Sequence, residues 1–114
     1  MARAERTLVK SPPELWELVD DHELMGRWAA ELLDAEQPVS VEVTIRENGE
    51  RLAWRPAGPR YAASMELTLA EKGWGTNVSI EARCERPPGP TLEAVLERLL
   101  DELGSPQRRP FARN

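Results

Sequence analysis

The stretch TLEAVLERLLDEL, Thr91–Leu103, is the most strongly periodic segment of the chain. Its apolar residues recur at the spacing of one broad helical face: Leu92, Val95, Leu96, Leu99, Leu100 and Leu103. Thr91 suits the N-cap, and Gly104 suits the position just beyond the last helical residue. The pattern predicts an amphipathic C-terminal helix, which needs a matching apolar surface elsewhere in the chain.

That surface is predicted by the segment after Pro38, where the apolar period changes to that of a strand. Asn48-Gly49 is typical of a hairpin, and Glu71–Gly75 (EKGWG) forms a second turn with two glycines able to take positive φ. Four successive segments alternate apolar and polar residues, which predicts an antiparallel sheet with one dry face. The residues expected to face inward are Val39, Val41, Val43, Ile45, Leu52, Trp54, Tyr61, Ala63, Met65, Leu67, Leu69, Val78, Ile80, Ala82 and Cys84.

The N-terminal part predicts a strand and two short helices. Glu5–Lys10 is the candidate strand. Ser11 and Glu14 match a capping box around Pro12, which predicts a helix start. His22–Ala30 predicts the second helix, although its Gly26 costs about 1 kcal/mol relative to alanine.

Length and composition favour one small domain, residues 1–104, followed by a flexible tail, 105–114. A net charge of −5 argues against nucleic acid and anionic membranes as partners. The single cysteine excludes an internal disulfide, and no run is apolar enough to span a bilayer. We therefore expect a cytoplasmic protein.

Three blocks of sequence carry a family resemblance: Lys10–Trp28 (KSPPELWELVDDHELMGRW), Arg51–Gly58 (RLAWRPAG) and Gly75–Glu85 (GTNVSIEARCE). They resemble the START-like or SRPBCC superfamily, which includes polyketide cyclases, birch-pollen-allergen-like proteins and heat-shock ATPase activators. The resemblance implies an apolar ligand held between sheet and C-terminal helix. The family normally places two more strands before Val39, but Glu31–Pro38 is too short for a hairpin. The expected fold is therefore α+β, a reduced helix-grip. It has an antiparallel sheet of about five strands in the order 2-3-4-5-1, two short helices after the first strand, and a C-terminal helix packed across the sheet.

Candidate chemistry is sparse. Asp20-Asp21-His22-Glu23 is the only cluster of reactive side chains, but consecutive residues point in different directions and no second His or Cys ligand is available. A solvated turn between two helices is the more ordinary interpretation. Cys84 alternates with inward strand residues, which favours a buried structural thiol. We therefore predict no catalytic residue, no metal site and no cofactor.

The aromatic residues suggest a binding site, because tryptophan often lies at pocket edges or interfaces. Our candidate lining is Trp28, Trp54, Tyr61, Met65, Leu96 and Leu99. The leading function is non-catalytic binding of a small hydrophobic ligand between sheet and helix. In the alternative these residues fill the core of a protein-interaction or assembly module, with a homodimer formed through the Val39–Glu47 edge. A cyclase-like enzyme is the third reading.

Overall fold

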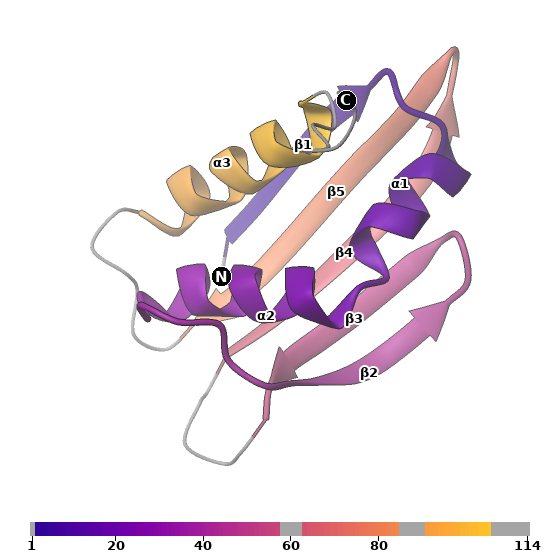
Figure 1. Ribbon diagram of the computed structural model, residues 1–114. Helices are drawn as coiled ribbons and strands as arrows, with labels where there is room; N and C mark the ends of the chain where they lie inside the picture. Colours follow the sequence, from indigo (N-terminus) through magenta and orange to yellow (C-terminus); the bar gives the residue numbers. More distant parts are fainter. Residues whose placement is uncertain (1, 58–62, 85–90, 106–114) are drawn as a thin grey trace, which may run out of the picture.

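The computed structural model describes residues 2–57, 63–84 and 91–105, which form an antiparallel sheet with helices on one face (Figure 1). The elements are β1 (Ala2–Leu8), α1 (Pro12–Val19), α2 (His22–Leu33), β2 (Val41–Glu47), β3 (Arg51–Pro56), β4 (Ala63–Lys72), β5 (Gly75–Cys84) and α3 (Leu92–Gly104). The strand order is β1-β5-β4-β3-β2, which is the predicted order. The predicted α+β class and the packing of the C-terminal helix on the sheet are both confirmed.

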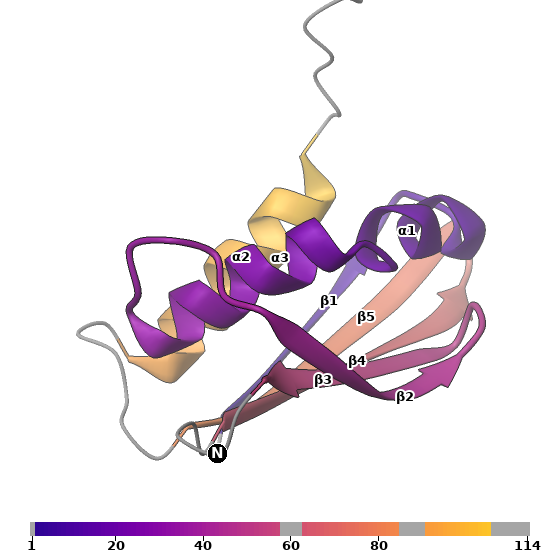
Figure 2. The ribbon, with the colours of Figure 1, turned by 60° about the horizontal axis from the view of Figure 1, so that its bottom comes forward.

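Helices α2 and α3 cover different parts of the same face of the sheet. Helix α3 lies mainly along β1, with smaller contacts to β5 and α2, while α2 reaches β2, β3 and β4. Figures 1 and 2 show α2 and α3 side by side over the same face, with α1 near the β4–β5 turn. The strands in the β2–β4 half therefore meet α2 rather than α3.

The apolar stripe of α3 is fully used. All six of its predicted apolar side chains are buried, and the Thr91 side chain caps the helix by accepting a hydrogen bond from the Ala94 N–H at 3.2 Å. The expected stop at Gly104 is wrong by one position, because Ser105 is the C-cap and has an ordinary φ of −73°. No left-handed residue is needed there, since Lys10 Nζ donates to the carbonyls of Leu103 and Ser105 at 2.8 and 2.7 Å.

Arg6 fastens β1 to α3 from the outside. Its guanidinium bonds to Asp101 and, at 2.5 Å, to Glu97. These hydrogen bonds, Asp101 first and then Glu97, raise the pKa of Arg6 above its ordinary value. A partly exposed pair of this kind contributes about 0–1 kcal/mol, so burial of the stripe is the larger effect.

Three element boundaries differ from expectation. Strand β2 begins at Val41 rather than Val39, because the Val39 N–H donates to the Gly26 carbonyl of α2 instead of pairing in the sheet. Strand β1 spans Ala2–Leu8 rather than Glu5–Lys10, because it pairs with β5 from Ala2 opposite Ala82 to Leu8 opposite Thr76. Helix α2 passes Ala30 and ends at Leu33, where Asp34 takes a left-handed φ of 57°. The bounds of β1 are set by its pairing with β5, which the local sequence pattern does not reveal.

Gly26 lies inside α2 for a packing reason. A Cβ at this position would stand 2.7 Å from the backbone oxygen of Val39, and the Val39 N–H donates to the Gly26 carbonyl at 3.3 Å. The missing side chain lets the loop after α2 lie against the helix. The two glycines of the β4–β5 turn are needed for different reasons. Gly73 takes a left-handed φ of 57°. Gly75 allows close packing, because a Cβ there would lie 1.9 Å from the Leu8 backbone oxygen.

Strand β2 contains a bulge that reverses its faces. Val43 is opposite Trp54, but Ile45 is opposite Ala53, so Thr44 is the extra residue. The predicted inward position of Ile45 is therefore wrong, and this side chain lies on the outer face of the sheet with Ala53. Beyond the bulge Arg46 stands opposite the core residue Leu52 and bonds to Asp20 of the helix layer at 2.9 Å.

Candidate ligand-binding site between α2 and the sheet

Two tryptophans meet where α2 crosses the sheet. Trp28 comes from the buried side of α2, and Trp54 comes from the inward face of β3, opposite Met65 on β4. Their ring centroids are 6.3 Å apart with the planes tilted by 43°, a favourable geometry for aromatic pairs. Both side chains have 0% exposure.

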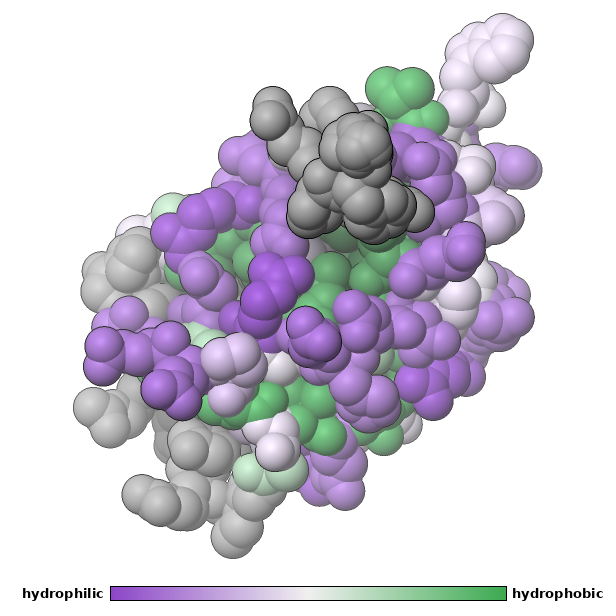
Figure 3. Space-filling view, viewed as in Figure 1, coloured by the Kyte–Doolittle hydropathy of each residue, from purple (hydrophilic) through white to green (hydrophobic). Residues whose placement is uncertain are grey.

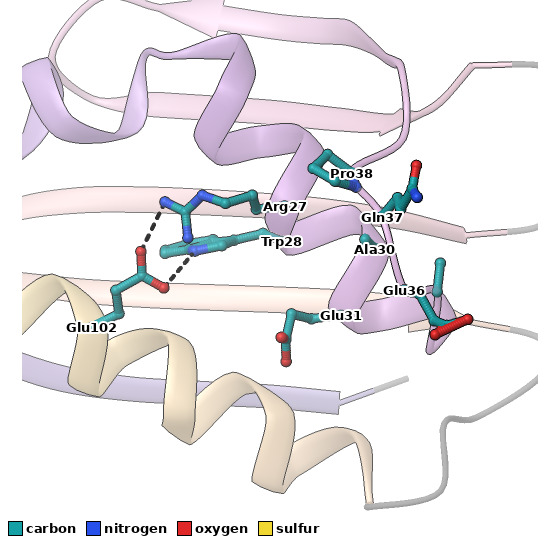
Figure 4. A pocket seen from close by; sticks show the side chains of 9 residues that line it. Arg27, Trp28, Ala30, Glu31, Glu36, Gln37, Pro38 and Glu102 are labelled. Atoms are coloured by element: carbon teal, nitrogen blue, oxygen red, sulfur yellow. Dashed lines mark hydrogen bonds and ion pairs between the residues drawn. The ribbon is translucent and has the colours of Figure 1, made fainter.

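The two indole N–H groups have different partners. Trp28 Nε1 donates to Glu102 Oε1 of α3 at 3.2 Å, and Arg27 Nη2 donates to the other oxygen of the same carboxylate at 3.0 Å (Figure 4). Trp54 Nε1 is buried and has no acceptor among the described residues. An unpaired buried donor of this kind costs about 1–3 kcal/mol, so it needs a physical explanation.

Arg51 Nε is also buried without a partner in the described part of the chain. The rest of its guanidinium bonds to Glu47 at 3.0 Å and to Glu66 at 3.4 Å. The Arg51 side chain is 40% exposed, so solvent water has access to its guanidinium group. Trp54 has no such access, which makes its N–H the informative case.

The structure separates the predicted lining residues into two groups. Trp28, Trp54 and Met65 lie together between α2 and the sheet. Leu96 and Leu99 are buried on α3, which lies chiefly against β1. Tyr61 lies outside the described residues. We therefore centre the candidate site on the first group, with α3 closing one side.

A cleft of about 250 Å³ is lined by one member of this group, Trp28. The other residues of its lining come from α2 and the segment after it, and Glu102 reaches it from α3 (Figure 4). Its lining residues are Arg27, Trp28, Ala30, Glu31, Ala35, Glu36, Gln37, Pro38 and Glu102. Sequence reasoning missed Arg27 and Glu102, because nothing in a single sequence links residues 75 positions apart.

A second hollow, of about 270 Å³, lies on the outer face of the sheet. It is lined by Thr44, Ile45, Ala53, Ser64, Met65, Glu66, Glu81 and Arg83. The bulge at Thr44 supplies its apolar wall by turning Ile45 outward. On the opposite, helix-bearing face, hydrophobic residues show in the seam between the helices within a mainly hydrophilic surface (Figure 3).

The acidic cluster near His22 has structural partners. Asp20 bonds to Arg46, and the Asp21 side chain caps α2 by accepting the Glu23 N–H at 3.1 Å. His22 is exposed. Among the described residues, no group of three or more His, Cys, Asp or Glu side chains could hold a metal ion.

Cys84 is half-buried against the core, and its Sγ donates to the Leu32 carbonyl at 3.6 Å. Within the described ranges, no helix is long and apolar enough to cross a membrane.

Comparison with known proteins identifies the fold. No family model matches the chain, and no curated protein matches it. Several solved structures are similar. DR_A0006 from Deinococcus radiodurans is 25% identical, with a TM-score of 0.62 over 88% of this chain and 93% of that one. CalU16 from Micromonospora echinospora is 19% identical, with a TM-score of 0.62 over 90% of this chain and 70% of that one. The Aha1 dimer from Colwellia psychrerythraea is 12% identical, with a TM-score of 0.59 over 91% of this chain and 97% of that one.

Proposed function

We propose that the chain binds a small, mainly apolar ligand that carries an oxygen acceptor, in the interior between α2 and the sheet, and that it catalyses no reaction there. The observation that carries this proposal is the buried Trp54 Nε1, which has no acceptor among the described residues. A carbonyl or hydroxyl oxygen of a ligand would satisfy this donor and remove its desolvation cost. The surrounding Trp28 and Met65 side chains suit an apolar body.

The fold supports the same proposal. We further propose that the chain is a shortened member of the START-like or SRPBCC superfamily, on the three sequence blocks that resemble it. Five of the six predicted lining residues lie in the described part of the chain, and none of these five is an acid, base or nucleophile: Trp28, Trp54, Met65, Leu96 and Leu99. A binding role therefore fits this interior better than a cyclase-like reaction.

Calorimetric titration with two matched probes tests the proposal. Acetylnaphthalene and ethylnaphthalene have nearly the same shape, but only the first has a carbonyl oxygen. The wild type should bind the ketone about 3- to 10-fold more tightly, since one net hydrogen bond contributes about 0.5–1.5 kcal/mol. Trp54→Phe keeps an aromatic ring and should lose the preference for the ketone.

Trp74→Phe is the matched control. This tryptophan lies in the β4–β5 turn with 99% exposure, so its replacement should leave both affinities unchanged. If neither probe produces heat or raises the melting temperature of the wild type, the interior is a filled core and the ligand proposal is wrong.

The open edge of β2 favours assembly as a second candidate function. Strand β2 is at the end of the sheet order, and Val41 and Val43 on it are half-buried. One solved structure with this fold is that of a dimer, which supports a homodimer here. We propose the Val39–Glu47 edge as its interface because β2 is the end strand. The bulge at Thr44 and the inward Arg46 act against it, because both disrupt regular edge pairing.

Light scattering on edge variants tests this second candidate. Thr44→Lys adds a charge at the exposed edge and should shift a dimer toward monomer. Thr68→Lys makes the same change at an exposed position of β4, an inner strand, and should leave the dimer intact. A wild type that stays monomeric at high micromolar concentration would contradict the homodimer.

A further inference from the structure

Trp28 both lines the cleft above α2 and packs against Trp54, whose indole N–H has no acceptor among the described residues. The centroids of the two rings are 6.3 Å apart. Trp28 has 0% exposure, so a route from the cleft to Trp54 past this ring would require the ring to move.

Glu102 restrains that ring through an exposed carboxylate. One oxygen accepts the Trp28 indole N–H, and the other accepts Arg27 at 3.0 Å. The Glu102 and Arg27 side chains are 41% and 49% exposed. An exposed ion pair contributes little to stability, and water or a ligand can compete for it. The contact that holds Trp28 therefore lies where an incoming molecule meets the protein first.

The charges around the cleft favour one class of ligand. Three carboxylates line it, from Glu31, Glu36 and Glu102, and two guanidinium groups, of Arg27 and Arg98, bond to two of them. Arg98 bonds to Glu31, while Glu36 has no ion-pair partner among the described residues. In Figure 4 Glu31 extends from α2 toward α3, between the two helices, as Glu102 does from α3. A ligand carboxylate would meet like charge, whereas an amide or ammonium group could donate to Glu102.

We infer that the α2–α3 cleft is the entrance to the Trp54 site, that Glu102 holds Trp28 as its closure, and that its carboxylates select neutral or cationic ligands over anionic ones. This inference rests on the proposed function. It names a ligand class: an aromatic or alicyclic body with an oxygen acceptor for Trp54 and no negative charge. Free fatty acids fall outside that class.

Titration with naphthylacetamide, N-(2-ammonioethyl)naphthylacetamide and naphthylacetate tests the selectivity, because all three carry a carbonyl oxygen and differ in charge. At low ionic strength the neutral and cationic probes should bind the wild type about tenfold more tightly than the anion. Glu102→Gln keeps an acceptor for Trp28 but removes the charge, so it should reduce the difference in affinity between the anionic probe and the other two. Glu93→Gln makes the same charge change at an exposed position of α3 outside the cleft lining, and should leave this difference in affinity unchanged.

Hydrogen exchange at the Trp28 indole N–H tests the closure. Glu102→Ala should speed this exchange and the association of naphthylacetamide several-fold, while Glu93→Ala should change neither. Equal affinities for all three probes, or unchanged exchange and association rates in Glu102→Ala, would overturn the inference. If acetylnaphthalene still binds in that case, the proposed function stands and only the entrance is wrong. If no probe binds the wild type, both are wrong.

Discussion

The ring centroids of Trp28 and Trp54 lie 6.3 Å apart in the same interior, yet among the described residues only the Trp28 indole N–H has a protein acceptor. That acceptor is the carboxylate of Glu102 on α3. In a core built only for stability, both donors would be paired or one ring would be an apolar residue. This unequal pairing is the observation on which our ligand proposal rests.

The stability of the fold should depend most on the α3 stripe. Leu99 is 2% exposed in the middle of the stripe, so Leu99→Ala should lower the free energy of unfolding by about 2–5 kcal/mol. Glu93→Ala, at an exposed position of the same helix, should change it by no more than about 0.5 kcal/mol. Urea melts of both variants measure this, and equal losses would mean that α3 does not bury the face assigned to it. Glu97 is a poorer control than its exposure suggests, because it pairs with Arg6.

Gly26→Ala should destabilise the protein, although helix propensity alone predicts a gain of about 1 kcal/mol. The added Cβ would stand 2.7 Å from the Val39 backbone oxygen, so the loop after α2 must shift and the Val39 N–H bond to Gly26 would be strained. Thermal melts should show a lower melting temperature than that of the wild type. A raised melting temperature would show that the loop does not pack on α2 in solution.

Lys10→Met should cost about 1 kcal/mol, because Lys10 Nζ satisfies two carbonyls at the C-terminus of α3 and lies near the negative end of its dipole. Methionine keeps the apolar stem and removes the charge and the donors. Lys72→Met removes an exposed lysine at the end of β4 and should have almost no effect. If the two variants unfold at the same denaturant concentration, Lys10 does not cap α3.

Periodicity predicted the parts of the fold that depend on local pattern. The stripe of α3, the capping box at Ser11 and the antiparallel meander of β2 to β5 were readable from residue spacing, whereas the place of β1 beside β5 was an implication of the family resemblance. The bulge at Thr44 was not, because alternation continues through it in the sequence while the strand shifts register in space. Ile45 was therefore assigned to the wrong face.

The candidate site was only partly readable for a related reason. The inward phase of Trp54 and Met65 follows from alternation, and both are buried. Which helix covers them depends on how two helices divide one sheet face, and this is a tertiary property. The pairing of Trp28 with Glu102 joins residues 74 positions apart, so no local signal could reveal it.

The measurement that tests the central claim most directly is the nitrogen–proton NMR spectrum of the tryptophan side chains, with the Trp54 indole resonance assigned by its loss in Trp54→Phe. Saturating acetylnaphthalene should move this resonance downfield and slow its hydrogen exchange, because the buried N–H acquires an acceptor. Ethylnaphthalene should leave it without a downfield shift, and neither probe should move the resonance of the exposed Trp74. A Trp54 resonance that stays in place with both probes, in a protein whose melting temperature is also unchanged, would contradict the account.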